Sequence, residues 1–223
     1  MFAQELRAAG ARKVYAAARN PEHIPLNGVV RVVLDVTAPD AIAAAARECL
    51  DVNLLINNAG VSHWSGFLSV GAVEAARSEI ETNYFGPLLL SRAFAPVLAK
   101  NGGGAIVNIL SILSWVSVSD GGTYSASKAA AWALTNWLRT GLREQSTQVL
   151  GVHSGPIDTD MASELTLPKV KPVDVVRQVL SALEAGRDEV LADEMTRQVK
   201  AGLSDEVGIY LDFDPGQSLA TAR

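Results

Sequence analysis

The run Ala105-Ile106-Val107-Asn108-Ile109-Leu110 has the length of a β-strand and shows little alternation between apolar and polar side chains. A strand with this composition is buried on both faces, which is typical of a parallel sheet covered by helices. Similar short apolar runs recur along the chain, and longer stretches with helical periodicity separate them. The sequence therefore predicts an α/β fold, a doubly wound parallel sheet with helices on both faces.

These two patterns also give the expected elements. Strands are predicted at residues 13–18, 29–34, 53–57, 105–110, 149–153 and 189–192. Helices are predicted at residues 2–9, 39–50, 70–100 with a break near Thr82, 123–144 and 172–185. Residues 1–208 then form one domain. Residues 209–223 form a tail with Pro215 and Gly216 that is expected to be disordered or to dock on a partner subunit.

Size and composition limit the function classes. The chain has 223 residues, of which 48% are hydrophobic, enough for one domain with a sizeable core. A formal charge of -5 and scattered Lys and Arg residues give no basic surface for nucleic acid. The longest apolar stretch, residues 87–98, contains Arg92 and is too short to span a bilayer, and the first residues lack the pattern of a signal peptide. We expect a cytoplasmic protein without nucleic-acid or membrane partners.

Cysteine and histidine usage argues against disulfides and metal sites. Cys49 is the only cysteine, which excludes an intrachain disulfide and suits a reducing compartment. His23, His63 and His153 have no metal-ligand spacing among themselves or with Cys49. We therefore predict no bound metal.

Tyr124 and Lys128 stand four residues apart, so their side chains share one face of a helix. A free phenol has a pKa of about 10, and each unit of depression corresponds to about 1.36 kcal/mol. Lowering the pKa to near neutrality therefore requires roughly 4 kcal/mol of preferential phenolate stabilisation, part of which a nearby ammonium supplies. The same spacing also arises by chance, pairing a solvated lysine with a half-buried tyrosine.

Two segments follow predicted strands, at the sheet edge where ligands bind in this architecture. Ser111 ends the run 105–110 and places a hydroxyl donor there, although strand-end serines more often satisfy loop backbone groups. Ser114 is an alternative donor, but it stands closer in sequence to Tyr124. The segment Asn57-Asn58-Ala59-Gly60 follows the strand 53–57. Its small residues let a ligand approach the backbone and its amides bond to neighbouring strands, with an ordinary loop as the alternative.

Six motifs occur together in the order of one family. They are Asp35 at a strand end, Asn57 to Gly60, Asn83 in Thr82-Asn83-Tyr84-Phe85-Gly86, Ser111, Tyr124 with Lys128, and Gly155-Pro156-Ile157-Asp158-Thr159. From about residue 3 to residue 186 the chain resembles the short-chain dehydrogenase/reductase family. The resemblance implies a Rossmann-like fold and an NAD(P)-dependent oxidoreductase that interconverts a carbonyl and a secondary alcohol by hydride transfer.

The resemblance also implies roles for individual residues. Tyr124 is the general acid/base, and Lys128 lowers its pKa and holds the nicotinamide ribose. Ser111 orients the substrate carbonyl, and Asn83 holds a proton-relay water. The implied cofactor contacts are Asp35 and Val36 at the adenine, Asn57, Ala59 and Gly60 at the central portion, and Ile157 and Thr159 at the carboxamide end.

Cofactor choice depends on the end of the predicted strand 13–18. A carboxylate there would accept hydrogen bonds from the adenosine ribose, whereas a 2′-phosphate requires cationic donors. Ala18 occupies the acidic position and Arg19 follows it, so the sequence favours NADP over NAD. The alternative for Arg19 is a solvated loop charge.

The chain departs from the family at its beginning. Family members start with a strand and a glycine-rich TGxxxGxG turn that holds the pyrophosphate, whereas this chain opens with the helix that follows them. The missing strand would lie between the strands 13–18 and 53–57. Its absence leaves two rows of backbone groups unpaired, at about 1 to 3 kcal/mol for each buried group, or forces the neighbouring strands together. We expect a true start upstream of Met1. The competing hypothesis is a catalytically silent Rossmann-like binding or interaction protein.

Substrate and assembly are less constrained by the sequence. A small apolar carbonyl or alcohol is suggested by Leu113, Trp115, Val118 and Met161, with His63 and Trp64 as further candidates for the pocket. For Trp64 and Trp115, surface or interface packing is the open alternative. Trp132 and Trp137, on the Tyr124 helix, are interpreted as packing or subunit contacts. The family resemblance implies a homodimer or homotetramer. The region from Ala192 lacks the strand and Asp-Gly-Gly sequence that usually carry tetramer contacts.

Overall fold

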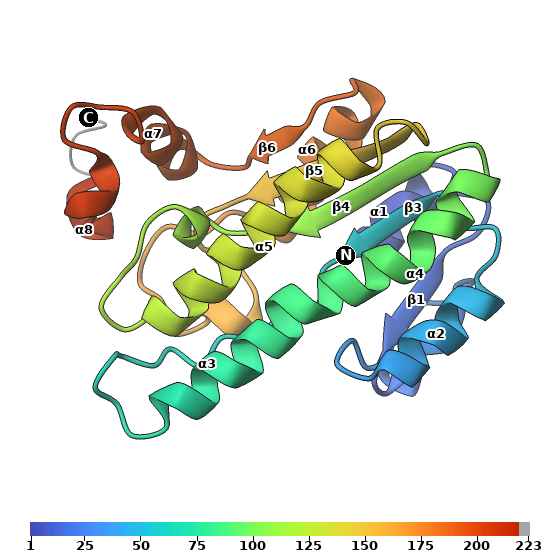
Figure 1. Ribbon diagram of the computed structural model, residues 1–223, viewed down its shortest axis with the longest axis horizontal. Coiled ribbons are helices and arrows are strands. Elements are labelled where there is room, and N and C mark those ends of the chain that lie inside the picture. Colours follow the sequence, from blue (N-terminus) through green and yellow to red (C-terminus); the bar gives the residue numbers. More distant parts are fainter. Residues whose placement is uncertain (219–223) are drawn as a thin grey trace.

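A parallel sheet organises the chain, which a computed structural model describes over residues 1–218 (Figure 1). Its strands are β1 (Tyr15–Ala18), β2 (Val30–Val33), β3 (Leu54–Asn57), β4 (Gly104–Ile109), β5 (Thr147–His153) and β6 (Glu189–Leu191). All the pairings are parallel: β1 with β2, and β3 to β6 in sequence order. The α/β fold class predicted from the sequence is confirmed.

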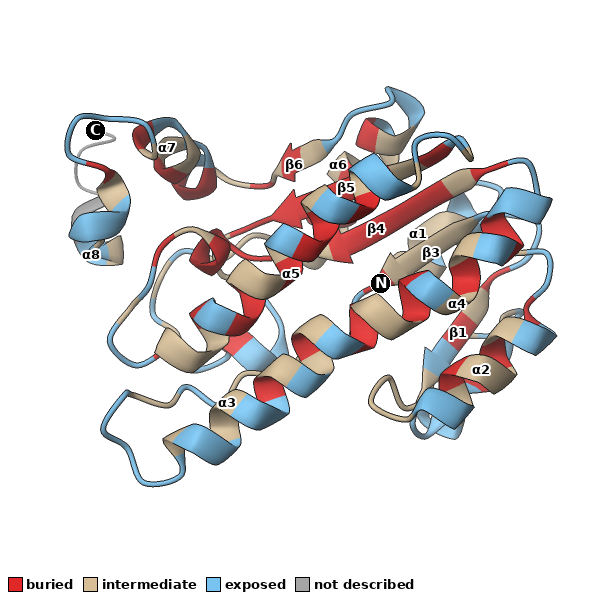
Figure 2. Cartoon of the chain, in the orientation of Figure 1, coloured by how far each residue is buried: buried red, intermediate tan, exposed pale blue. Residues whose placement is uncertain are grey.

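Helices cover both faces of this sheet. On one face lie α2 (Pro39–Glu48), α4 (Gly86–Lys100) and α5 (Gly122–Gly141), and on the other lie α1 (Phe2–Ala8) and α6 (Pro172–Glu184) (Figure 1). Successive residues of β4 divide between the two layers, since Ile106 packs with Leu98 of α4 and Val107 packs with Val179 of α6. β4 and β5 are therefore buried on both faces (Figure 2), as their apolar sequences predict.

The sheet is interrupted between β1 and β3, which are not hydrogen-bonded to each other. Backbone bonds join Val30 N to Val14 O and Ala105 N to Asn53 O. Since alternate residues of a parallel strand face opposite neighbours, the backbone groups of Tyr15 and Ala17 in β1, and of Leu54 and Ile56 in β3, point into the gap. The two unpaired rows expected from the sequence are therefore present in the described chain.

Asp51 connects the two parts of the sheet near the amino ends of β1 and β3. It accepts a hydrogen bond from the Tyr15 hydroxyl at 2.6 Å and one from Lys13 Nζ at 3.1 Å. Both contacts are exposed, and exposed ion pairs contribute about 0 to 1 kcal/mol. The apolar cluster that packs β2 and α2 against α4 is the larger connection between the two parts.

The helical region 70–100 contains the predicted break near Thr82. α3 (Ala72–Ile80) runs into a π-helical turn, Glu81–Phe85, and then into α4. Gly86 N donates to Glu81 O, one residue beyond the α-helical partner. Pro87 explains the irregularity, because it lacks the N–H that an α-helix would donate to the Asn83 carbonyl.

The end of the chain differs from expectation. Helix α7 (Glu194–Gly202) was not predicted, because most of its residues are polar. Its signals were Asp193, whose carboxylate caps the helix by accepting from Thr196 N, and the spacing of Met195 and Val199, which pack into the core.

The described part of the tail packs against its own chain. After a short helical turn, Ile209–Leu211, comes α8 (Pro215–Ser218), and Ile209 and Phe213 pack against the cluster that contains Leu113 and Met195. Residues 219–223 of the predicted tail lie outside the described part. Among the described helices, none has the length and apolar character needed to cross a bilayer.

Candidate active site

The four predicted catalytic side chains come together at the carboxyl edge of β3 and β4. Lys128 Nζ donates to the carbonyl of Ile109, the last residue of β4, at 2.8 Å. Asn83 Nδ2 donates to Ser127 Oγ, beside Lys128, at 2.9 Å. A Cβ on Gly60 would lie 3.2 Å from Asn83 Oδ1 and 3.7 Å from Lys128 Nζ, so the loop after β3 passes directly over both side chains.

Ser111 is held by its backbone and side chain, between β4 and a 3₁₀ turn formed by Ile112–Ser114. Its backbone N donates to Ser114 Oγ at 3.3 Å, and its own Oγ accepts from Leu113 N at 3.1 Å. The Ser111 hydroxyl is also hydrogen-bonded with the Tyr124 phenol, so the two side chains share one position at the sheet edge. Ser114, the alternative donor, is used to hold Ser111.

Tyr124 is protonated at neutral pH. The pKa of its phenol is raised to about 12, mainly because the ring is buried; hydrogen bonding with Ser111 lowers the pKa, and the charge of Glu79 raises it. Burial also lowers the pKa of Lys128 to about 8, and its Nζ lies 5.6 Å from the centroid of the Tyr124 ring. Lys128 was expected to lower the pKa of the Tyr124 phenol. Among the protein residues alone, the pKa of this phenol is raised instead.

Asn83 and Glu79 fasten the loop that follows Gly60. The amide of Asn83 accepts from Val61 N and donates to Val61 O, both at 2.9 Å, and Glu79 Oε1 accepts from His63 N at 2.7 Å. Glu79 is fully buried, and its Oε2 has no hydrogen-bond partner among the described residues. Sequence reasoning missed Glu79. The pattern that could have indicated Glu79 is its position four residues before Asn83, which places both side chains on the same helix face.

This fastened loop brings Trp64 to the active site. The Trp64 ring lies 6.0 Å from the Tyr124 ring, centroid to centroid. The Trp64 backbone has a φ of 45°, a conformation that non-glycine residues rarely adopt and that concentrates at functional sites. Trp64, predicted as a candidate for the substrate pocket, therefore lies beside Tyr124. Trp115, the other tryptophan considered, packs in the interior against Trp132 and a histidine.

The predicted adenine contacts lie at the ends of β1 and β2. The pKa of Asp35 is lowered mainly because Thr37 N and Oγ1 donate to its carboxylate, and the charge of Arg19 adds to this effect. Arg19 itself is exposed. Val36 packs its side chain against Gly86 at the beginning of α4.

The remaining cofactor candidates lie at the ends of β3 and β5. Asn57 is buried, and its Nδ2 donates to Asn108 Oδ1 at 2.7 Å. Its side-chain amide therefore links β3 to β4, as predicted. Ala59 is exposed beyond it. Ile157 forms an isolated bridge with Val170, and Thr159 Oγ1 donates to Ile157 O at 3.3 Å.

Asp193 is a second residue that sequence reasoning missed. Its Oδ2 accepts from Gly155 N at 2.7 Å, which fixes the start of the loop containing Ile157 and Thr159. The chemistry of these residues fits a nicotinamide dinucleotide at its two ends, because the buried Lys128 ammonium lies beside Tyr124 at one end and the exposed Arg19 cation lies near Asp35 at the other. A glycine-rich phosphate turn is not present in residues 1–218.

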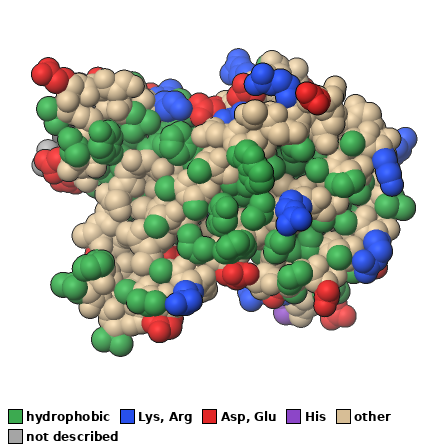
Figure 3. All heavy atoms as spheres, viewed as in Figure 1, with side chains coloured by type: hydrophobic (Ala, Val, Ile, Leu, Met, Phe, Trp, Pro, Cys, Tyr) green, Lys and Arg blue, Asp and Glu red, His purple; other side chains and the backbone are tan. Residues whose placement is uncertain are grey.

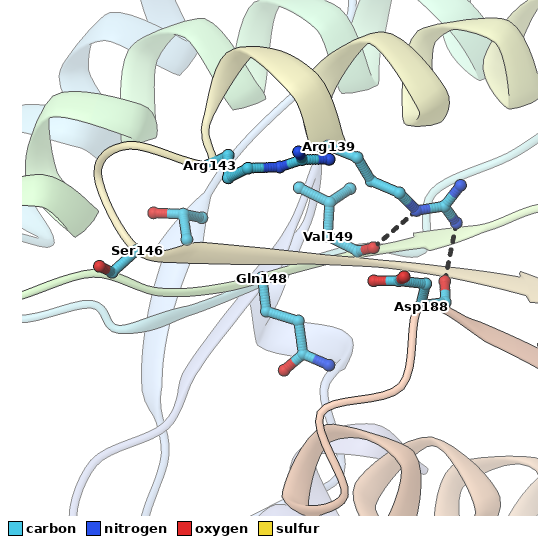
Figure 4. A pocket seen from close by; sticks show the side chains of 7 residues that line it. Arg139, Arg143, Ser146, Gln148, Val149 and Asp188 are labelled. Carbon is cyan, nitrogen blue, oxygen red and sulfur yellow. Dashed lines mark hydrogen bonds between the residues drawn. The ribbon is translucent and has the colours of Figure 1, made fainter.

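A surface pocket of about 300 Å³ lies at the other end of β5 and is unrelated to this site (Figure 4). Arg139 in its wall donates to Val149 O at 3.1 Å and to Asp188 O at 2.7 Å, so its guanidinium already serves the protein backbone. Within residues 1–218, no group of three or more His, Cys, Asp or Glu side chains is placed to hold a metal ion.

Comparisons with known proteins agree with this geometry. A family model described as short chain dehydrogenase matches residues 1–169. Dehydrogenase/reductase SDR family member 7B of Bos taurus is 33% identical over 183 residues, 74% of this chain and 56% of that protein. The chain thus spans little more than half the length of this curated relative.

Two solved structures are similar over most of the chain. A short chain dehydrogenase of Burkholderia cenocepacia J2315 in complex with NADP is 40% identical, with a TM-score of 0.88 over 99% of this chain and 90% of that chain. A 7α-hydroxysteroid dehydrogenase complexed with NADH and 7-oxo glycochenodeoxycholic acid is 25% identical, with a TM-score of 0.72 over 80% of this chain and 82% of that chain. Because the family model covers most of its length, this chain belongs to the short-chain dehydrogenase/reductase family.

Proposed function

We propose that the protein is an NADP-dependent oxidoreductase that interconverts a carbonyl and a secondary alcohol. The observation that carries this proposal is the convergence of Ser111, Tyr124 and Lys128 at the carboxyl edge of β4, with a protonated phenol beside a buried ammonium. The similar 7α-hydroxysteroid dehydrogenase, complexed with a 7-oxo ligand, is consistent with this reaction class.

Each side chain has a separate task in the reduction direction. The Ser111 hydroxyl, hydrogen-bonded with Tyr124 in the described structure, donates to the substrate carbonyl oxygen, and Tyr124 gives that oxygen its proton. A bound nicotinamide supplies the hydride and, once oxidised, a positive charge near the phenolate. Lys128 adds its ammonium beneath Tyr124 and is placed to hold the nicotinamide ribose.

In this proposal, the backbone carbonyl of Asn83 binds the proton-relay water, and the Asn83 side chain does not. Both amide hydrogens of its side chain are already donated, to Val61 O and Ser127 Oγ. Its carbonyl lacks the α-helical donor that Pro87 cannot supply, so a water can take that place.

The preference for NADP rests on Arg19. Arg19 is exposed at the end of β1 and close enough to Asp35 to lower its pKa, which puts a cation at the proposed adenine end. Ala18 offers no carboxylate to a ribose hydroxyl. The Burkholderia relative was solved with NADP.

Substrate and assembly complete the proposal. We assign a small apolar carbonyl or alcohol as substrate, because Trp64 lies beside Tyr124. We also assign a homodimer or homotetramer. Figure 3 shows hydrophobic side chains gathered over α4 and α5, where Trp137 is 64% exposed and Phe85 is 40% exposed. A cytoplasmic location is inferred from composition alone.

A silent binding protein is the second candidate, and the interrupted sheet favours it. NADPH fluorescence titration distinguishes the two, performed on the 223-residue polypeptide and on a version extended by the in-frame upstream codons. Binding by either form, together with turnover that Tyr124→Phe removes, supports the enzyme. Failure of both forms to bind NADPH supports the silent protein.

A further inference from the structure

His153, at the end of β5, is a fully buried side chain directly behind Ser111. Its Nδ1 lies 3.1 Å from the Ser111 carbonyl oxygen. Its ring stacks on Trp115 with centroids 3.8 Å apart and an interplanar angle of 19°. None of the roles described above uses this residue.

The protonation state of His153 follows from its partners. Burial lowers its pKa to about 4, so the imidazole is neutral at physiological pH and has a single N–H. A carbonyl oxygen only accepts hydrogen bonds, so the bond to Ser111 requires that the hydrogen is on Nδ1. Nε2 is then an acceptor, and it has no hydrogen-bond partner among the described residues.

Residues from β6 and α7 fix the ring in this position. Glu189 and Lys200 form an ion pair at 3.1 Å, and Lys200 Nζ lies 4.9 Å from the centroid of the Trp115 ring that stacks on His153. Glu189 Oε1 is 3.9 Å from His153 Nε2, but both atoms are acceptors, so this contact does not compete with the bond to Ser111.

The bond from His153 completes the restraint of Ser111. The other restraints are the bond from Ser114 N to the same carbonyl at 3.0 Å, the Ser114 hydroxyl on the Ser111 backbone N, the Leu113 amide on its Oγ, and the bond from Ile112 N to Ser154 O at 2.8 Å. Without the imidazole donor, the Ser111 carbonyl keeps only the bond from Ser114 N, and the peptide between Ser111 and Ile112 loses one of its buried restraints.

We propose that His153 is a positioning residue, which fixes the direction of the Ser111 hydroxyl through a hydrogen bond from Nδ1–H to the Ser111 carbonyl. The proposal rests on the proposed function for its kinetic consequence. Its geometry rests on the contacts of His153 alone.

Two variants separate the hydrogen bond from the volume of the ring. His153→Asn keeps an N–H donor at the position that Nδ1 occupies, and His153→Leu has a similar apolar volume without a donor. In the NADPH-linked reduction of acetophenone, we expect His153→Leu to lower kcat about tenfold, within the range found when a supporting hydrogen bond is removed at other sites. We expect His153→Asn to stay within threefold of the parent, with KM and the NADPH Kd nearly constant in both variants.

A double-mutant cycle tests whether the effect passes through Ser111. In a Ser111→Ala background, His153→Leu is expected to lower the residual kcat less than twofold. A further tenfold loss in that background, or equal losses for His153→Leu and His153→Asn, would overturn the proposal.

NMR tests the same bond without any turnover. A long-range ¹H–¹⁵N correlation is expected to show the hydrogen of His153 on Nδ1. The Leu113 amide is expected to exchange with solvent at least tenfold faster in His153→Leu than in His153→Asn or the parent. A hydrogen on Nε2, or equal Leu113 exchange in the three proteins, contradicts the proposal even if no carbonyl is reduced. Inactivity with these NMR results intact would instead count against the proposed function.

Discussion

At the residue scale, burial and hydrogen bonding give Tyr124 and Ser111 different tasks. Burial keeps the phenol of Tyr124 protonated, and the bond from Leu113 N fixes the Ser111 hydroxyl beside it. We expect Tyr124→Phe to lower kcat by about 10² to 10⁴-fold, the usual contribution of a positioned acid/base group, while NADPH affinity changes little. Steady-state kinetics and NADPH titration measure the two effects. Activity within threefold of the parent would refute the assignment of Tyr124.

Arg19 is expected to distinguish the two dinucleotides. A charge-assisted hydrogen bond to a 2′-phosphate contributes about 1.5 to 3 kcal/mol and is absent with NADH. Arg19→Ala should therefore weaken NADPH binding about 10 to 100-fold and leave NADH binding nearly unchanged. Parallel fluorescence titrations of the parent and the variant provide the measurement. Equal losses for both cofactors would show that Arg19 does not contact the phosphate.

Lys128 is expected to make stability depend on pH. Its pKa falls from 10.5 to about 8 on folding, so the unfolded chain binds more protons between these values and stability rises with pH there. Tyr124 acts oppositely and at higher pH, because its pKa rises from 10.0 to about 12. Urea denaturation between pH 8 and pH 10 should show a smaller rise for Lys128→Met, by up to about 1.36 kcal/mol per pH unit. The control is Lys100→Met, an exposed lysine, and an unchanged rise in Lys128→Met would contradict the assignment.

Short-range patterns in the sequence predict which residues form the site, but not all of their supports. Ser111, Tyr124 and Lys128 are recognisable because a strand end and a helical spacing place them. His153 receives its role from Ser111, 42 residues earlier, and from Lys200 of a later helix. Contacts between residues so far apart leave no pattern in the local sequence. The raised pKa of Tyr124 could not be predicted either, because it depends on how deeply the folded chain buries the phenol.

At the element scale, the π turn between α3 and α4 is the feature with a functional consequence. Pro87→Ala supplies an N–H that can donate to the Asn83 carbonyl and continue the α-helix, so the melting temperature should rise. In the proposed proton relay, the same bond would take the place of the water at the Asn83 carbonyl, so we expect kcat to fall several-fold with little change in the NADPH Kd.

The matched control is Pro96→Ala, in the interior of the same helix α4 and away from Asn83. It should raise the melting temperature without lowering kcat. Thermal melts and steady-state kinetics of the two variants give the comparison. A Pro87→Ala enzyme with full activity would mean that the carbonyl of Asn83 has no part in proton transfer.

Element positions were predictable where burial imposes a pattern. β4 and β5 were predictable because both of their faces are covered, which makes their sequences almost continuously apolar. α7 was missed because only a narrow face of it is buried, with Met195 and Val199 as its apolar contacts. Gly104 begins β4 at a close approach to the neighbouring strand, since a Cβ there would lie 2.1 Å from Asn53 O.

At the scale of the whole molecule, the interrupted sheet predicts an alternating pattern of amide protection. In β1, Ala16 and Ala18 face β2, whereas Tyr15 and Ala17 face the gap. We expect the amides of Tyr15 and Ala17 to exchange with solvent at least tenfold faster than those of Ala16 and Ala18 in the 223-residue polypeptide. Residue-resolved hydrogen exchange by NMR measures this, with the paired strand β4 as the protected reference. Uniform protection along β1 would show that the gap is closed in solution.

The same interruption has a mechanical meaning for a ligand that spans the site. Arg19 and Asp35 belong to the part built on β1 and β2, and Tyr124 and Lys128 to the part built on β3 to β6. Side-chain packing along α4 joins these parts, and backbone bonds do not cross between β1 and β3. In the proposed function, a dinucleotide held by residues of both parts would cross this interruption. Its binding is therefore expected to restrain the two parts relative to each other.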